Sequence, residues 1–292
     1  MRQIIGILTL FIVHFGCYSQ SLEAYPMEEN ALLWKIEGPN IKSDSYLFGT
    51  IHMIAKSEFY YPKKLSKIVD KTDQVVLEIA DLNPVTAMQY IVLKQGSFFD
   101  YFNEAQIDTI LFWAKTEAGM DEAKFRFTMS QLKPFAVVQL ATQMSIKVPT
   151  ESYELTIQSQ AKAQNVPLLG LETIEDQIGI FDRMDSTEQA NLVMESIRNY
   201  AKSDSLMNEM QSLYLKQNVD RMYQFITESD GSIQDMSAEL LDKRNQNWIP
   251  LISEFIQTKD TFIAVGAGHL GGPNGVLRLL EKAGYTLTPV QL

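Results

Sequence analysis

The sequence predicts a mixed α/β (α+β) protein in which a central mixed sheet is flanked by helices and encloses a helical middle. Short apolar runs that are typical of strands lie towards both ends of the chain, whereas residues 186–258 contain almost none. Hydrophobic residues make up 46% of the 292 residues and charged residues 21%, which is enough apolar material for a large core. Because strands from both ends must share one sheet, we expect a single domain over residues 21–292.

Six apolar runs bounded by turn residues are predicted to be strands. The first two flank Gly38-Pro39-Asn40, a turn signal, and are expected to pair as an antiparallel hairpin. The third is apolar apart from one carboxylate, which is typical of an interior strand. The six expected strands are residues 32–37, 46–50, 74–79, 166–171, 261–265 and 285–290.

Helices are predicted between these strands from their periodicity and their end residues. Pro62 suits the first turn of a helix, Asn103 suits an N-cap, and Gly284 suits the stop of the last helix. Outside residues 186–258, the expected helices are residues 62–71, 84–94, 103–115, 134–144, 152–164, 175–184 and 273–283. Within residues 186–258, breaks between helices are expected near Ser203, Asn218 and Gly231.

The first 20 residues are predicted to be a secretory signal peptide. Arg2 supplies a positive start, and Ile4 to Phe15 form an apolar stretch shorter than the roughly 20 residues that a spanning helix needs. We therefore expect an exported protein, periplasmic or extracellular. The only cysteine, Cys17, follows this stretch and raises the alternative of a lipid anchor, although the residues before it fit a lipoprotein signal poorly.

Charge and composition narrow the classes of partner. The net charge is −11, so the chain gains nothing from displacing phosphate counterions, and we expect neither nucleic acid nor an anionic lipid surface as a partner. No segment after the signal is apolar enough to be a transmembrane span. Once the signal is removed no cysteine remains, so no thiol nucleophile is expected. The oligomeric state is not predicted.

Two Gly-x-x-His motifs are the main clue to function. Gly49-Thr-Ile-His52 and Gly266-Ala-Gly-His269 each follow a predicted strand, and the third histidine of the chain, His14, lies in the predicted signal. Strands of one sheet can bring such turns together, and crevices at strand ends are where α/β folds place ligands. We therefore expect His52 and His269 to form one site.

Two carboxylates and an arginine are candidates for the same site. Glu78 ends an apolar strand, where an unpaired carboxylate is costly unless it ligates a cation. Glu172 follows another strand, and Arg244 could bind an oxyanion or a substrate carboxylate. Imidazoles with carboxylates are typical of Zn, Mn, Co or Fe sites. Each residue also has an ordinary structural interpretation: a strand-end acid, a helix N-terminal acid and a solvated helix residue, respectively.

The segment Gly266-Ala-Gly-His-Leu-Gly271 also matches the G-x-G-x-x-G pattern of dinucleotide-binding turns. The strand expected after it, residues 285–290, ends without an acidic residue that could hold a ribose. We therefore do not expect a nucleotide site here.

Taken together, these motifs resemble the TraB/GumN family, which includes the TIKI metalloproteases. The segments that carry the resemblance are Leu47–His52, Val75–Glu78, Leu169–Thr173 with Gln177, Arg244-Asn245 with Trp248, and Val265–Leu270. The resemblance implies a fold related to the erythromycin esterase and ChaN-like group. Its TIKI branch implies a metal-dependent peptidase that uses Mn or Co and requires its Gly-x-x-His histidines.

The function expected is a secreted or periplasmic metallohydrolase, most simply a peptidase, acting on a peptide or another small substrate. His52, Glu78 and His269 would hold a divalent cation (Mn or Co, with Zn as a further candidate), and a glutamate that is not a ligand, such as Glu172, would be the general base. Arg244 would stabilise the oxyanion. Two alternatives remain open: a metal-free esterase-like hydrolase, and a non-enzymatic protein that binds a metal or haem.

Overall fold

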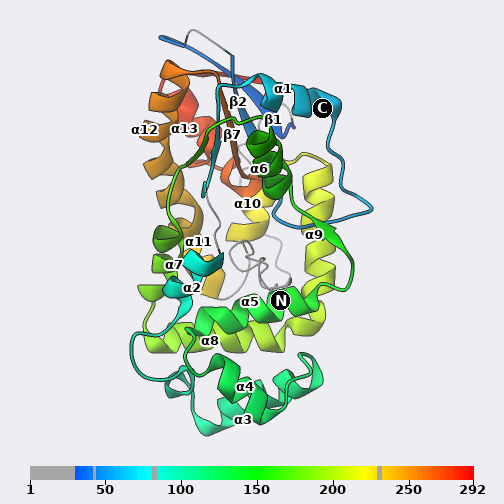
Figure 1. Ribbon diagram of the computed structural model, residues 1–292, viewed down its shortest axis with the longest axis vertical. Helices are drawn as coiled ribbons and strands as arrows, with labels where there is room; N and C mark the ends of the chain where they lie inside the picture. Colours follow the sequence, from blue (N-terminus) through cyan, green and yellow to red (C-terminus); the bar gives the residue numbers. More distant parts are fainter. Residues whose placement is uncertain (1–29, 42–43, 81–83, 229–231) are drawn as a thin grey trace.

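A computed structural model of the chain describes residues 30–41, 44–80, 84–228 and 232–292. Its centre is a six-stranded mixed sheet with the order β6-β4-β7-β2-β1-β8 (Figure 1). The strands of this sheet are β1 (Leu33–Glu37), β2 (Ser45–Thr50), β4 (Gln74–Leu77), β6 (Leu168–Gly170), β7 (Thr261–Gly266) and β8 (Thr286–Pro289). The predicted mixed α/β class is therefore confirmed. The predicted signal peptide, with Cys17, lies outside the described residues.

Four neighbouring strands run parallel, so their carboxyl ends meet at one edge of the sheet. β4 pairs in parallel with β6 and β7, and β7 pairs in parallel with β2. β1 is antiparallel to both β2 and β8, which confirms the expected hairpin. The register places Thr50 opposite Gly266, so the two predicted histidine turns leave the sheet side by side.

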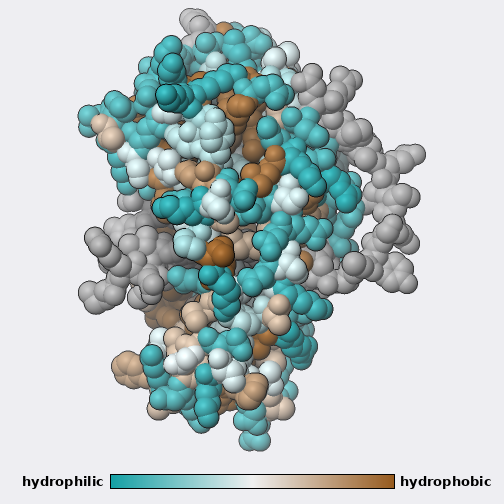
Figure 2. Space-filling model, turned by 90° about the vertical axis from the view of Figure 1, so that its right-hand side faces the viewer, coloured by the Kyte–Doolittle hydropathy of each residue, from teal (hydrophilic) through white to brown (hydrophobic). Residues whose placement is uncertain are grey.

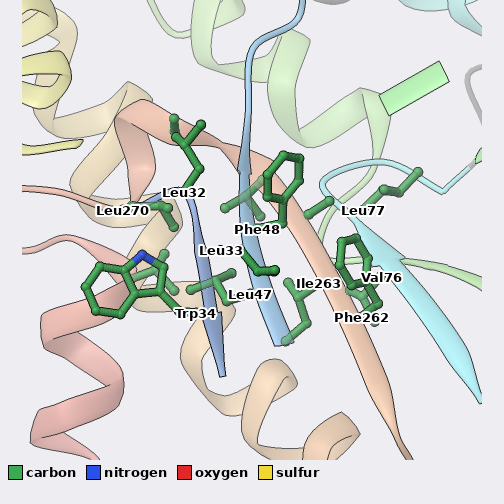
Figure 3. Close-up of a cluster of buried hydrophobic side chains, with 14 of the residues drawn as sticks. Leu32, Leu33, Trp34, Leu47, Phe48, Val76, Leu77, Phe262, Ile263 and Leu270 are labelled. Atoms are coloured by element: carbon green, nitrogen blue, oxygen red, sulfur yellow. The ribbon is translucent and has the colours of Figure 1, made fainter. Parts of the chain in front are cut away.

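Helices cover both faces of the sheet. In Figure 1, α12 (Lys243–Thr258) and α13 (Val276–Lys282) lie on one side, and α1 (Lys63–Lys71) and α6 (Tyr153–Ala163) lie on the other. Apolar side chains of the central strands fill the space between the layers, including Phe48 and Phe262 (Figure 3). The burial of these side chains supplies the main favourable free energy that holds the strand ends in place.

The helical middle forms a second layered body below the sheet in Figure 1, with its own apolar core. Helices α5 and α8 pack against each other, and the ring of Phe135 in α5 stacks on that of Phe181 in α7 at 4.2 Å. Its helices are α2 (Pro84–Ile91), α3 (Glu104–Thr116), α4 (Glu122–Met129), α5 (Pro134–Ser145), α7 (Ile174–Asp182), α8 (Ser186–Arg198), α9 (Ser203–Leu215), α10 (Val219–Thr227) and α11 (Ser232–Ser237). Short 3₁₀ turns span Phe98–Tyr101 and Tyr200–Lys202, and a small two-stranded sheet pairs β3 (Ile54–Ala55) with β5 (Thr150–Glu151).

The face shown in Figure 2 carries the polar and charged residues expected from the composition. Hydrophilic residues cover most of the face shown in Figure 2, and hydrophobic residues are visible between them in the middle of that face. None of the helices within the described ranges has the length and apolarity needed to span a bilayer.

Several predicted boundaries were wrong for local reasons. The last helix begins at Val276 rather than near Pro273, because Gly272 takes a left-handed conformation (φ 80°) and closes a turn with Gly275. A helix capped by Asp121 was not predicted. Neither was a turn of π-helix at Ala238–Asp242, which leads directly into α12. Such π-turns occur often at functional sites.

Candidate active site

The ends of β2 and β7 bring the two Gly-x-x-His motifs to one point. A Cβ atom built on Gly266 would lie 3.7 Å from His52 Nε2, 3.5 Å from His269 Cδ2 and 3.3 Å from Glu78 Oε1. Three of the predicted residues therefore surround the bare backbone of Gly266. The absence of a side chain at this position leaves room for a small group between the two imidazoles and the carboxylate.

The other glycines of the turn are explained by close packing. A Cβ on Gly268 would lie 2.5 Å from Ile226 Cδ1, and one on Gly271 would lie 2.3 Å from the carbonyl oxygen of Val219. Both neighbours belong to α10, which lies against the turn Ala267–His269 (Figure 1). The G-x-G-x-x-G pattern here thus permits a helix to approach the backbone.

Arg244 connects the two predicted carboxylates. Its Nη2 lies 2.5 Å from Glu78 Oε2 and 2.5 Å from Glu172 Oε1, and its Nε donates to both oxygens of Glu172 at 3.1 Å. Its Nη1 donates to the Leu240 carbonyl at 2.8 Å, within the π-helical turn, and lies 3.1 Å from His269 Nε2. Every nitrogen of the guanidinium therefore already has a protein partner, so the arginine is a buried structural cation rather than the solvated residue of the ordinary interpretation.

His269 is buried and held in one orientation. Its Nδ1 lies 2.7 Å from Asn245 Oδ1, and the amide of Asn245 donates to the carbonyl of Asn274 at 2.9 Å. A tautomer protonated at Nδ1 satisfies the Asn245 contact and leaves Nε2 to accept from Arg244. Burial, together with the charges of Arg244 and His52, lowers the pKa of His269 to about 3 despite the opposing charge of Glu78. His269 is therefore neutral at ordinary pH.

His52, in contrast to His269, is positively charged at neutral pH. Its Nδ1 forms an ion pair at 2.7 Å with Glu154 Oε1, which also accepts from the Thr50 hydroxyl at 2.5 Å. Burial lowers the pKa of His52, but the charge of Glu154, the contact with it and the charge of Glu78 outweigh burial and raise that pKa to about 9. The His52 side chain is 30% exposed, so it is the histidine that a ligand can reach.

Glu154 is the site residue that the sequence analysis missed. It lies on α6, and the buried side of that helix consists of Tyr153, Glu154, Ile157 and Ala161. A signal was available, since residues 154, 157 and 161 have the spacing of one helix face and Glu154 is the acidic member of an otherwise apolar stripe.

Glu78 and Glu172 share one arginine but differ in their acidity. Burial raises the pKa of Glu78, yet the positive charge of Arg244, the two histidines and the 2.8 Å hydrogen bond from Gly266 N outweigh it and lower that pKa to about 2. For Glu172, burial and the charge of Glu78 raise the pKa in spite of Arg244. Gln177 donates to both carboxylates, at 3.2 and 2.6 Å, respectively. Glu78 is thus the more acidic of the two carboxylates.

A cavity of about 120 Å³ opens beside these groups. Its polar wall is formed by four of the five predicted residues, namely His52, Glu78, Arg244 and His269. The fifth, Glu172, reaches the site through its bonds to Arg244. All five sequence candidates therefore lie at one site, and four of them, Glu78, Glu172, Arg244 and His269, are joined by the bonds of Arg244.

The donor set does not fit a first-row cation in this arrangement. Glu78 Oε1 and His269 Nε2 lie 3.8 Å apart, a spacing that an ion at about 2.0–2.2 Å from each could bridge. However, the Arg244 guanidinium already meets the lone pair of His269 Nε2 and the other oxygen of Glu78. Over the described ranges, no group of three or more His, Cys, Asp or Glu side chains is arranged to hold a metal ion.

Comparison with known proteins agrees with the resemblance seen in the motifs. The model of the TraB/PrgY/gumN family matches residues 32–289. The chain belongs to the TraB/PrgY/gumN family. The match spans both Gly-x-x-His motifs and the residues of α9 and α10 that line the cavity, so the pocket lies within the TraB/PrgY/gumN region. No curated protein and no solved structure matches the chain.

Proposed function

We propose that the chain is a hydrolase that cleaves an acyl bond of a peptide or ester, with His52 as general acid and Glu78 as general base. The observation that carries the proposal is the meeting of His52 Nε2 and Glu78 Oε1 at the bare backbone of Gly266. The pKa shifts give an ionised carboxylate and a protonated imidazole at neutral pH, the forms that a base and an acid need, with room for a water molecule between them.

The base would be the ionised carboxylate of Glu78. Its Oε1 faces the gap at Gly266, while Arg244 and Gln177 hold its Oε2. A water molecule in this gap would give its proton to Oε1 as its oxygen attacks the acyl carbon. Arg244 positions Glu78 and keeps it charged; it does not bind the oxyanion, because its donors are already engaged.

The acid would be the imidazolium of His52. The carboxylate of Glu154 lies 2.7 Å from Nδ1 and favours the charged ring, and Nε2 lies on the cavity side, beside Gly266. The proton on Nε2 would stabilise the negative oxygen of the tetrahedral intermediate and then move to the leaving group. His269, neutral and bonded to Arg244, supports the arginine.

The metal implied by the family resemblance takes no part in these steps, because Arg244 already engages His269 Nε2, one of the nitrogens that would bind it. Binding of Mn or Co at His269 would require the guanidinium to leave that nitrogen. The proposal is therefore the metal-free hydrolase.

Hydrolysis of a panel of peptides and p-nitrophenyl esters tests the proposal. We expect wild-type activity to fall by about 100-fold or more in His52→Gln and in Glu78→Gln, as is typical for loss of an acid or base. Gln291→Ala, near the end of the chain, is the matched control and should keep full activity. Variants that fold, as judged by circular dichroism, and retain wild-type rates would contradict the proposal.

A further inference from the structure

The cavity has two unlike walls. The sheet edge supplies the polar groups described above, whereas the opposite wall comes from the helical middle and is apolar. Its side chains belong to α9, α10 and the π-helical turn: Met207, Met210, Met222, Ile226, Leu240 and Leu241. The proposed acid–base chemistry uses none of these six residues, so the apolar wall needs another explanation.

The size of the cavity limits what it can hold. A volume of about 120 Å³ is slightly below the roughly 150 Å³ of an engineered apolar cavity that binds benzene. The part of a ligand that enters the cavity is therefore about the size of a branched aliphatic group or one aromatic ring.

The wall combines fixed and adaptable parts. Met222, Leu240 and Leu241 are buried, and Ile226 lies against Gly268, so the rear of the wall is set by the packing of α10 and the π-helical turn. Met210 is partly exposed at the cavity. Methionine is flexible and polarisable, so it packs against both aliphatic and aromatic groups.

We propose that this apolar wall is a specificity pocket that takes an apolar side group of about the size of a benzene ring, adjacent to the acyl bond to be cleaved. The substrate class is then a peptide or ester whose acyl component resembles leucine, methionine or phenylalanine. The inference rests on the proposed function for the cleavage itself, but the pocket can be tested by binding alone.

Binding is measured by NMR of protein labelled with ¹³C in the methionine methyl groups, titrated with N-acetyl-leucinamide and N-acetyl-glycinamide. We expect saturable shifts of the Met207, Met210 and Met222 signals with the leucine ligand, at a concentration at least about tenfold lower than with the glycine ligand. Met129 and Met194 are buried in the helical core but do not line the cavity, so they are internal controls and should not shift.

A pair of substitutions at the exposed part of the wall sharpens the test. Met210→Gln places a polar amide in the pocket and is expected to weaken N-acetyl-leucinamide by about tenfold, whereas Met210→Leu should bind within about threefold of wild type. Equal binding of both ligands, or shifts confined to Met129 and Met194, would overturn the specificity pocket.

The outcomes separate this inference from the proposed function. Selective binding without any hydrolysis of the corresponding leucine ester would support the specificity pocket and contradict the proposed hydrolase function. Hydrolysis at equal kcat/KM for glycine and leucine esters, without methionine shifts, would do the reverse.

Discussion

At the scale of single residues, the site has few positively charged groups, and each of them is paired with carboxylates. Arg244 neutralises two carboxylates, and Glu154 holds a proton on His52, so the two histidines have different charges at the same pH. The difference follows from their partners: His52 faces a carboxylate, whereas His269 faces a guanidinium. Similar motifs thus give a charged histidine in one case and a neutral one in the other, which is why we propose His52 as the acid.

The pH dependence of activity tests the charge of His52. Its pKa is raised to about 9, so we expect kcat/KM to be level through neutral pH and to fall as pH rises through about 9, where the acid loses its proton. The free energy of unfolding should follow the same sign: the His52–Glu154 pair stabilises fully below pH 6.5 and is lost as pH rises through about 9. Glu154→Gln should move the alkaline limb to lower pH. A rate that instead rises through pH 6–7 would indicate an ordinary histidine acting as base.

At the scale of elements, the glycine-rich turn places the site by allowing α10 close to the end of β7. Because Gly268 and Gly271 have no side chain, the helix can lie against their backbone, whereas Gly266 faces the cavity. The same motif therefore carries two kinds of glycine, and only one of them is proposed to leave space for the reaction.

Gly266→Ala separates these two kinds of glycine. The new Cβ would lie 3.3 Å from Glu78 Oε1 and 3.7 Å from His52 Nε2, so we expect at least a tenfold loss of activity with the fold intact, because water is displaced from the gap. Gly179→Ala in α7 is the control: its Cβ would meet only Arg183 at 3.7 Å, and Ala in a helix should raise stability by about 0.5–1 kcal/mol. Full activity in Gly266→Ala would show that the reaction does not use this space.

Strand ends were predictable from the sequence, because apolar runs followed by glycine and histidine mark both their position and their polarity. The strands that lead to His52 and His269 were located in this way, and the strand beside Glu78 was located from its apolar run alone. The parallel pairing of these strands confirms the expected juxtaposition of the two turns. Glu154 and the π-helical turn were not predicted. Their contributions depend on tertiary packing, which places Glu154 of α6 beside His52 and allows Arg244 to donate a hydrogen bond to the Leu240 carbonyl.

At the scale of the whole molecule, the helical middle completes the pocket that the sheet begins. The sheet edge holds the charged groups in fixed geometry, and α9, α10 and the π-helical turn close the opposite side with apolar residues. The sequence left the role of this middle region open. The family match includes it, and its residues in α9, α10 and the π-helical turn line the cavity.

Hydrolysis after exhaustive chelation tests the central claim most directly. Wild-type protein treated with EDTA and 1,10-phenanthroline should cleave its best ester or peptide substrate at its untreated rate, because Arg244 supplies the positive charge between Glu78 and His269. Added Mn or Co should not raise that rate. Loss of activity on chelation and its recovery with Mn or Co, but not in His269→Ala, would contradict the account and restore the two-histidine metal centre.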